Sequence, residues 1–338
     1  MTLTLRDLGW SPHFARQIED GPSLDLYRVA AVDRDRIAAL GPGGPVTLLP
    51  DRPVGEIAVG DWIAAEDGRM VRLFERETVL KRRAAGVEAR VQLIAANVST
   101  LFIVSSCNAD FNEARLERYL VLAREAGSYP VIVLTKADLA EEARDYVRRA
   151  EALQPMLTVL AVDARQDAEA VMAWCGRGQT AALLGSSGVG KTTLMNAMTG
   201  GAEATQGVRE DDAKGRHTTT RRSLRAMTNG GWLIDTPGMR ALRLTDAEAG
   251  IDEVFGDIVE LAGACRFADC AHEAEPGCAV QAAIAAGALE DGRLRRWRKL
   301  QSENRRNTET VAEARARDKS FGKMVREVMK EKTGRKGR

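Results

Sequence analysis

The chain has few cysteines, few aromatic residues and no long apolar run. Only 5 of its 338 residues are cysteine, too few for a disulfide-stapled scaffold, and Phe, Trp and Tyr together make up 5%. No apolar stretch approaches the roughly 18 residues that a membrane span needs, so we expect no contact with a membrane. Residues 1–7 lack the basic-then-apolar pattern of an export signal, which predicts a cytoplasmic protein.

The net charge of +1 conceals an uneven distribution. Residues 293–338 hold 17 Lys or Arg against 6 Asp or Glu, whereas the rest of the chain holds 32 against 42. A basic end on an otherwise acidic chain indicates an anionic partner, of which RNA is the commonest. A solvated helical tail explains the same charge, so composition alone leaves both interpretations open.

Short apolar segments separated by turn residues lie between residues 25 and 75. The candidate strands are 26–30, 36–40, 45–49, 61–64 and 70–74, with Gly, Pro and Asp between them. So many strands in so short a stretch predict a small closed barrel. Periodicity does not choose between an OB-fold and an SH3-like barrel.

Strands and helices alternate from residue 100 onwards. Buried strands are predicted at 100–105, 131–134, 157–162, 181–184 and 233–234, and a helix at 113–126. This alternation is typical of a mostly parallel sheet with helices on both faces, so the fold class is α/β. No strand is evident beyond residue 245, where apolar residues at helical spacing recur over 294–300 and 321–329.

The strongest motif is a glycine-rich loop between a predicted strand and a predicted helix. It reads Gly185-Ser186-Ser187-Gly188-Val189-Gly190-Lys191-Thr192. Such a loop wraps its backbone N–H groups around a phosphate. Lys191 would contact the outer phosphates and the Thr192 hydroxyl would bind Mg²⁺, which predicts a nucleoside triphosphate as ligand.

Two further motifs complete a GTP site. Asp235 and Gly238 belong to the sequence Asp-Thr-Pro-Gly, where the carboxylate would hold Mg²⁺ through water and the glycine N–H would contact the terminal phosphate. Thr135-Lys136-Ala137-Asp138 follows another strand, and the Asp138 carboxylate can accept two hydrogen bonds from guanine that adenine does not offer. The Lys136 stem can cover the base.

The order of these motifs is unusual. In ordinary GTPases the guanine motif follows the phosphate loop, whereas here it precedes it by some fifty residues. The sequence therefore predicts a circularly permuted GTPase, in which the same sheet is cut at a different surface loop. The region after Asp235 would then lead straight into the carboxyl-terminal part, and nucleotide state could be transmitted that way.

The water-activating group is less clear. Met239 follows Gly238, where many GTPases have a glutamine, and methionine cannot orient water. His217 is the nearest replacement, because histidine titrates near neutral pH, but a surface histidine without a catalytic role explains it as well. One threonine of the adjoining pair, Thr218 or Thr219, could complete the Mg²⁺ shell.

A cysteine cluster predicts a second metal site. Cys265, Cys270, His272 and Cys278 form a closed set of four ligands suited to one structural Zn²⁺. Separate buried thiols are the alternative. Cys107 and Cys175 stand in apolar surroundings and are predicted to belong to the core.

The chain resembles the ribosome-small-subunit-dependent GTPase A family. The resemblance lies in the permuted motifs, the Gly-Arg-His-Thr-Thr-Thr segment at 215–220, the cysteine spacing and the segment 92–98. The resemblance implies an OB-fold at 1–84, a circularly permuted GTPase domain at 85–245, and a helical zinc domain with a basic tail at 246–338. It implies hydrolysis of GTP to GDP and phosphate, stimulated by the small ribosomal subunit during late maturation, with rRNA as partner. We expect a monomer.

Carried over position by position, the family's site residues fall on matching residues of this chain. Guanine recognition falls on Thr135, Lys136 and Asp138, zinc on Cys265, Cys270, His272 and Cys278, and phosphate binding on Gly185, Ser186, Ser187, Gly188, Val189, Gly190, Lys191, Thr192 and Thr193. Asp163 stands where serine is usual in the family, and the tail past Arg315 is longer than expected. Thr135 replaces the asparagine common in other GTPases, although threonine is frequent in this family.

Two alternatives of other classes remain at this stage. A small-molecule kinase could use the same phosphate loop, although Asp138 argues against it. A nucleotide-gated RNA-binding module with little hydrolysis would share every motif, and only turnover in the presence of small subunits separates it from a GTPase.

Overall fold

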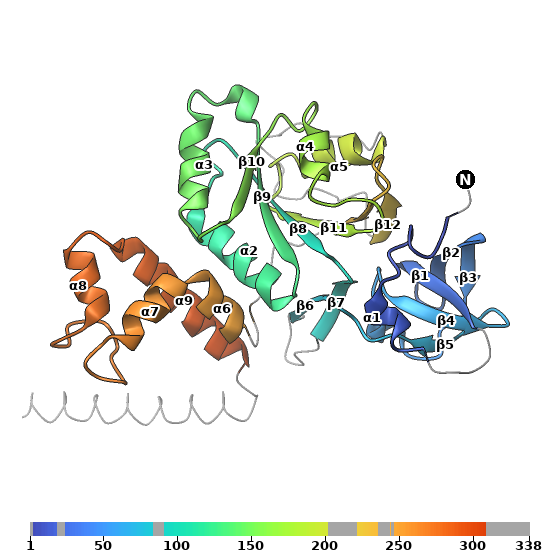
Figure 1. Ribbon diagram of the computed structural model, residues 1–338, viewed down its shortest axis with the longest axis horizontal. Helices are drawn as coiled ribbons and strands as arrows, with labels where there is room; N and C mark the ends of the chain where they lie inside the picture. Colours follow the sequence, from blue (N-terminus) through green and yellow to red (C-terminus); the bar gives the residue numbers. More distant parts are fainter. Residues whose placement is uncertain are drawn as a thin grey trace, which may run out of the picture.

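The computed structural model describes residues 3–18, 24–83, 91–201, 222–235, 244 and 247–308. Three parts are evident: a β-rich amino-terminal part at the right of Figure 1, a central sheet covered by helices, and a group of carboxyl-terminal helices at the lower left. None of the helices in these ranges is long and apolar enough to cross a membrane. His217, Thr218, Gly238 and the predicted helix at 321–329 lie outside the described residues.

The amino-terminal strands form one sheet that closes on itself. They are β1 (Asp25–Val32), β2 (Ile37–Gly41), β3 (Gly44–Leu48), β4 (Trp62–Glu66) and β5 (Arg69–Leu73), in the order β3-β2-β1-β4-β5. A parallel bridge between Leu49 and Arg69 brings the end of β3 against β5. This Greek-key closure, with β1 between β2 and β4, is that of an OB-fold, and it decides the choice that periodicity left open.

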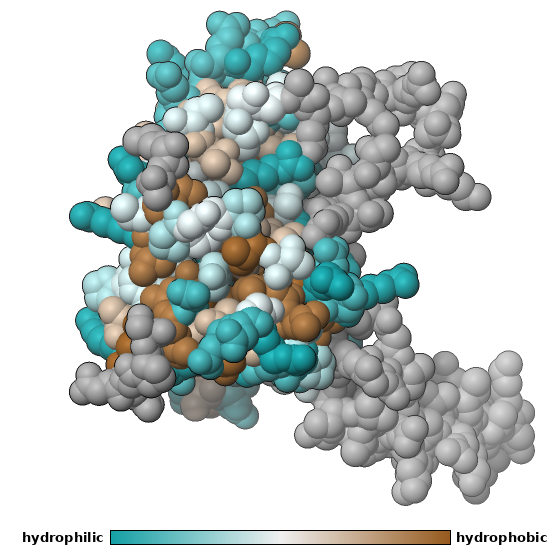
Figure 2. Space-filling model, turned by 90° about the vertical axis from the view of Figure 1, so that its right-hand side faces the viewer, coloured by the Kyte–Doolittle hydropathy of each residue, from teal (hydrophilic) through white to brown (hydrophobic). Residues whose placement is uncertain are grey.

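A short amino-terminal segment packs against the outside of the barrel, on the face of β4 that points away from the barrel core. Helix α1 (Pro12–Ala15) places Phe14 against Trp62, with ring centroids 6.0 Å apart, and Trp10 meets Trp62 edge-on at 4.9 Å. Both Phe14 and Trp62 are buried. The outer face of the barrel mixes apolar and hydrophilic residues (Figure 2), and its exposed large apolar side chains are Ile18, Leu49 and Val71.

A two-stranded hairpin leads from the barrel to the central sheet (Figure 1). Strand β6 (Val79–Arg83) pairs with β7 (Val91–Ala96) in antiparallel fashion. The sequence pattern gave no sign of β6, because a strand with Lys81, Arg82 and Arg83 has little apolar content. Residue 84 lies between these paired strands, and the division of the chain into domains at 84 and 245 stays a prediction.

The central sheet is six-stranded, and all but one strand run parallel. Its order is β10-β9-β8-β11-β13-β12, formed by β8 (Thr100–Ser106), β9 (Tyr129–Thr135), β10 (Thr158–Ala161), β11 (Thr180–Gly185), β12 (Ser223–Ala226) and β13 (Trp232–Asp235). Only β12 is antiparallel to its neighbour. Every residue of β8 is buried, as expected for a central strand of a covered parallel sheet. The predicted α/β fold is confirmed.

Helices cover both faces of this sheet. Alternate residues of β8 point into two different cores: Leu101 and Ile103 pack with α2 (Glu113–Glu125) and α3 (Ala143–Glu151), whereas Phe102 and Val104 pack with α4 (Ala168–Met172) and α5 (Lys191–Thr199). This alternation follows from the two-residue period of a strand. Cys107 and Cys175 lie in these cores, as predicted.

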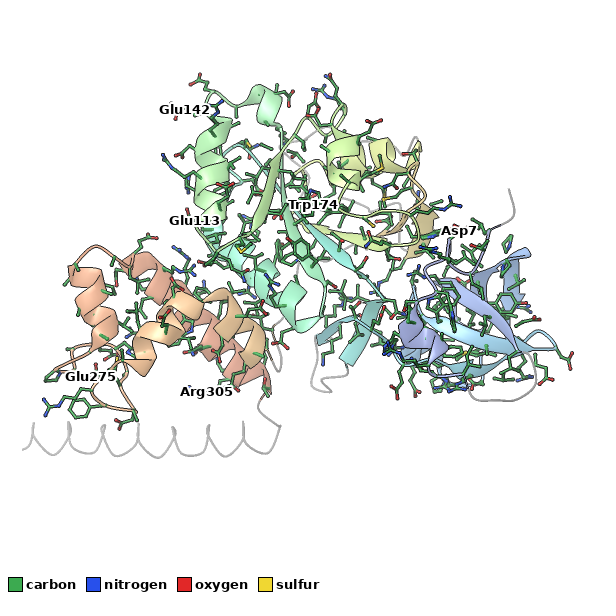
Figure 3. The ribbon with its side chains drawn as sticks, in the orientation of Figure 1. Asp7, Glu113, Glu142, Trp174, Glu275 and Arg305 are labelled. Carbon is green, nitrogen blue, oxygen red and sulfur yellow. The ribbon has the colours of Figure 1, made fainter. Side chains whose placement is uncertain are left out.

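The carboxyl-terminal helices adjoin the central part through the first and the last of them, which contact α2. They are α6 (Glu248–Val254), α7 (Gly256–Gly263), α8 (Ala279–Ala285) and α9 (Asp291–Thr308). Glu117 of α2 is fully buried and accepts hydrogen bonds from Arg293 (3.1 Å) and Arg296 (2.7 Å) of α9. Glu113, labelled in Figure 3, lies at the start of α2 and pairs with Arg149 of α3 at 3.0 Å.

A buried arginine ties the barrel to the central sheet. Arg28 of β1 is 1% exposed and donates to the Leu8 carbonyl (2.5 Å), the Thr180 hydroxyl of β11 (2.6 Å) and the Asn97 carbonyl (3.4 Å). Nearby, Asp7 (Figure 3) accepts a hydrogen bond from Arg177, which holds the pKa of its carboxyl below the usual range. The barrel therefore rests on the amino-terminal edge of the sheet, through polar contacts as well as apolar ones.

We predict that Arg28→Ala lowers the free energy of unfolding by about 3 kcal/mol, because it leaves buried carbonyl and hydroxyl groups without a donor. Chemical denaturation followed by tryptophan fluorescence measures the change. Arg36→Ala is the matched control, since the Arg36 side chain is 60% exposed and pairs with exposed Asp35. Equal stability of the two variants would show that Arg28 does not anchor the barrel.

Candidate functional site

The glycine-rich loop lies at the carboxyl end of the central strand β11. Gly185 ends the strand and Lys191 begins α5. A Cβ on Gly185 would lie 2.2 Å from the Val104 carbonyl oxygen of β8, so only glycine allows the loop to leave the sheet there. Gly188 and Gly190 have φ values of 80° and 91°, which favour glycine as well. The loop backbone is thereby turned into a cradle at the start of a helix.

Lys191 and the serines of the loop are held in defined places. The Lys191 ammonium donates to the Gly185 carbonyl at 2.8 Å and to the Ser186 carbonyl. The Ser186 hydroxyl meets Arg115 of α2, whose guanidinium is also 3.0 Å from Asp110. Ser187 and Thr192 are exposed and Thr193 is half-buried. The loop therefore presents a cation and hydroxyl groups at one edge of the sheet.

The guanine motif touches this loop directly. Thr135 ends β9 and its fully buried hydroxyl lies 2.5 Å from the Val189 carbonyl and 3.1 Å from the Ser105 carbonyl. Lys136 follows in a left-handed conformation (φ 59°), and its ammonium donates to the Gly188 carbonyl at 2.9 Å. Segments some fifty residues apart therefore form one site, as the permuted order requires.

Asp138 completes this side of the site. It lies in a short 3₁₀ turn (Ala137–Leu139), and its side chain is 30% exposed. Its carboxylate is 3.0 Å from the guanidinium of Arg165, which also contacts Asp163. Asp163 stands out in the sequence, whereas Arg165 does not, because a single arginine in a loop carries no pattern.

Asp235 lies on the other side of the loop. It ends β13, which runs parallel to β11 with Ala182 opposite Ile234, so both strands end at the same edge. The predicted Mg²⁺ ligand is therefore close to the predicted phosphate cradle in the sheet. The remaining predicted catalytic residues, His217, Thr218 and Gly238, lie outside the described residues.

The predicted zinc ligands form a compact cluster in the helical part. All four ligand atoms of Cys265, Cys270, His272 and Cys278 lie within 4.8 Å of one another. The Cys265 and Cys278 sulfurs are 3.9 Å apart, and the His272 Nδ1 is 3.5 Å from the first and 3.6 Å from the second. A tetrahedral ion with bonds of about 2.3 Å to sulfur and about 2.0 Å to nitrogen separates its ligands by about 3.5–3.8 Å.

The surroundings of the cluster suit metal-bound thiolates. The backbone N–H of Ala279 points at the Cys265 sulfur and that of Gln281 at the Cys278 sulfur, each at 3.4 Å, at the start of α8. Such donors stabilise negative sulfur. Burial lowers the pKa of His272, which keeps its ring neutral and able to bind a metal. Burial raises the pKa of Cys107 to about 11 and that of Cys175 to about 12, and it also raises that of Cys270 in the cluster to about 11.

A phosphate loop at the end of a parallel strand, in contact with a guanine motif that precedes it in the chain, defines a circularly permuted P-loop GTPase. The RsgA GTPase family model matches residues 73–245. The chain belongs to this family and is a GTP hydrolase, which decides against the kinase and the non-hydrolysing module.

Full-length relatives agree with this assignment. The chain is 54% identical over 316 residues to "Small ribosomal subunit biogenesis GTPase RsgA" of Mesorhizobium japonicum, covering 90% of this chain and 91% of the relative. It is 47% identical over 338 residues to "Small ribosomal subunit biogenesis GTPase RsgA 2" of Vibrio parahaemolyticus, covering 98% of this chain and 94% of the relative.

Two solved structures share the fold. YjeQ from Thermotoga maritima has a TM-score of 0.61 at 22% identity, over 82% of this chain and 97% of that one. YloQ, described as a circularly permuted GTPase, has a TM-score of 0.59 at 22% identity, over 87% of this chain and 99% of that one. The likeness extends over most of the chain, so it includes more than the GTPase sheet alone.

We predict that Thr135→Val raises the dissociation constant for GDP about tenfold, because the Val189 and Ser105 carbonyls lose their hydroxyl donor and the loop loses its tie to β9. Titration with a fluorescent GDP analogue measures the effect. Thr135→Ser keeps the hydroxyl and should bind within about threefold of the unchanged protein. A Thr135→Val variant that binds GDP as tightly as the unchanged protein would mean that the hydrogen bond of the hydroxyl does not matter.

Proposed function

We propose that this protein binds the small ribosomal subunit and hydrolyses GTP to GDP and phosphate as a factor in late subunit maturation. The observation that carries the proposal is the contact of Thr135 and Lys136 with the phosphate loop, which gives one site both a base-reading edge and a phosphate cradle. The names of the relatives at 54% and 47% identity supply the ribosomal context.

In this proposal each site residue has a defined task. Asp138 accepts the two N–H donors of guanine and the Lys136 stem covers the ring. The N–H groups of residues 185–193 hold the phosphates, while Lys191 turns from the loop carbonyls to the outer phosphates. Thr192 and Asp235, with Thr218, are the residues that would hold Mg²⁺, which neutralises the phosphate charge when bound.

Hydrolysis by the protein alone is expected to be slow. Met239 cannot position water, and we assign that task to His217 on the sequence alone. The subunit then acts by completing the set of groups that position the attacking water, and hydrolysis releases the protein from the subunit.

The division of labour follows the three parts of the chain. We assign 1–84 and the basic tail to rRNA binding, 85–245 to GTP hydrolysis and 246–338 to a zinc-stabilised helical domain. Arg16, Arg34 and Arg69 of this part are exposed and could contact phosphates. Contacts with phosphates would make binding strongly dependent on salt. The protein would act as a cytoplasmic monomer.

We expect purified small subunits to raise the rate of phosphate release from GTP at least tenfold, with no such effect on ATP. The reason is that the subunit completes a water-positioning set that the chain lacks. Large subunits serve as the matched control, and Lys191→Ala should abolish hydrolysis under every condition. A rate unchanged by small subunits would contradict the ribosomal role, and a preference for ATP would contradict the assignment of the base.

We expect one Zn²⁺ per chain, held by the three cysteines and His272, since the ligand distances and donor types suit this ion. Metal analysis of Cys265→Ser should show its loss, whereas Cys107→Ala, which removes a thiol of the sheet core, should retain it. Removal of zinc should destabilise the helical part, as judged by proteolysis, and leave GDP binding within about twofold. Zinc retained in Cys265→Ser would contradict the four-ligand site.

A further inference from the structure

Two loops meet at the guanine side of the site, and each brings a carboxylate. Strands β9 and β10 are parallel neighbours, with Leu134 opposite Ala161, so the segments that follow them leave the sheet together. The Ala137 N–H donates to the Val162 carbonyl at 3.3 Å, which holds the two segments side by side. Asp138 lies in the first segment and Asp163 in the second.

One arginine joins both carboxylates. The Arg165 side chain places a terminal nitrogen 3.0 Å from Asp138 Oδ2 and its Nε 3.1 Å from Asp163 Oδ1. The same terminal nitrogen is 3.4 Å from Asp163 Oδ2, so the guanidinium faces Asp163 with two nitrogens and Asp138 with one. Arginine suits this task because its planar fork holds two carboxylates in fixed directions, which the single ammonium of lysine does not.

Asp163 is fixed in its own loop as well. Its carboxylate accepts the backbone N–H of Arg165 and the side-chain amide of Gln166, each at 3.0 Å, and only 11% of its side chain is exposed. These hydrogen bonds, that of the Arg165 N–H first, hold the pKa of the Asp163 carboxyl below its usual value. Asp163 therefore stays ionised next to the carboxylate that reads the base.

We propose that Arg165 is a positioning residue that determines specificity for the base. Its guanidinium neutralises Asp163 and orients the Asp138 carboxylate toward the base. The Asp163–Arg165 pair therefore has the same effect on Asp138 as a neutral residue at position 163. This rests on the proposed reading of guanine by Asp138. A carboxylate has about four lone-pair positions, enough for Arg165 and two base N–H groups together.

The pair has a direct consequence for the choice of base. Guanine offers an amino group at carbon 2, whereas xanthine has a carbonyl oxygen there, which a fixed carboxylate repels. Without Arg165, the negative charge of Asp163 lies beside Asp138 with no counter-charge, and repulsion turns the Asp138 carboxylate away from the base. Guanine then loses its two hydrogen bonds. Xanthine loses only the bond from its N1–H and is at the same time relieved of the repulsion at carbon 2, so its binding changes little.

The test measures dissociation constants for GDP, XDP and ADP with the full chain and four variants: Arg165→Ala, Arg165→Lys, Asp163→Ser and the double variant Asp163→Ser/Arg165→Ala. For Arg165→Ala we expect GDP to bind about tenfold more weakly and XDP to be unchanged, the scale of a lost charge-assisted hydrogen bond. The GDP affinity of Arg165→Lys should lie between that of the unchanged protein and that of Arg165→Ala. Asp163→Ser should bind GDP almost normally.

The double variant is decisive. Removing Asp163 removes the need for its counter-charge, so Asp163→Ser/Arg165→Ala should recover GDP binding to within about threefold of the unchanged protein. Arg148→Ala is the matched control for the loss of a surface arginine, since its side chain is 80% exposed on α3. Thermal unfolding of each variant shows that the fold is kept, and the recovery by a second substitution excludes a simple folding defect.

Three results would overturn the proposal. Equal weakening of GDP and XDP would mean that Arg165 acts as a general positive charge, and a double variant as weak as Arg165→Ala would mean that it contacts the nucleotide itself. An Arg165→Ala variant with normal GDP binding would give it no role. If the unchanged protein does not prefer GDP to XDP and ADP, the reading of guanine by Asp138 fails first, and that result is distinct from the other three.

Discussion

The contact between the end of β9 and the phosphate loop is the constraint on which the rest of the site depends. The Thr135 hydroxyl and the Lys136 ammonium both bind carbonyl groups of that loop, at Val189 and Gly188. Strand β8 lies between β9 and β11, and Thr135 also contacts the Ser105 carbonyl of β8. This order of strands brings the end of β9 to the loop that follows β11. The order of strands in space, which is independent of the order in the chain, therefore determines the site.

Most of the fold and the main site motifs could be predicted because they depend on local patterns. The barrel strands, the buried strands around β8 and the four-ligand cluster follow from spacing and residue type. Arg165 could not be found in this way, because its importance comes from two aspartates, Asp138 and Asp163, that only the pairing of β9 with β10 brings to it. Strand β6 was missed because its stability comes from pairing with β7 and hardly from apolar content.

Helix α2 links the nucleotide site to the carboxyl-terminal helices. At its first turn Arg115 meets the Ser186 hydroxyl of the phosphate loop, and along the same helix Glu117 and Arg118 bind α9. Arg118 lies within hydrogen-bond distance of Glu303, and Glu117 is buried between two arginines. A buried carboxylate with two such partners resists the separation of α2 from α9, because separating the helices would leave a charge without a partner in the interior.

This arrangement changes the expectation about how nucleotide state reaches the carboxyl-terminal helices. The sequence suggested the chain connection after Asp235, but α2 offers a second, packed route that begins at Ser186 itself. The barrel is attached in a different way, at the opposite end of β11, where Arg28 binds Thr180. The phosphate loop is thus one helix away from the carboxyl-terminal helices and a full strand length away from the barrel, so packed contacts link the nucleotide site more directly to the helices than to the barrel.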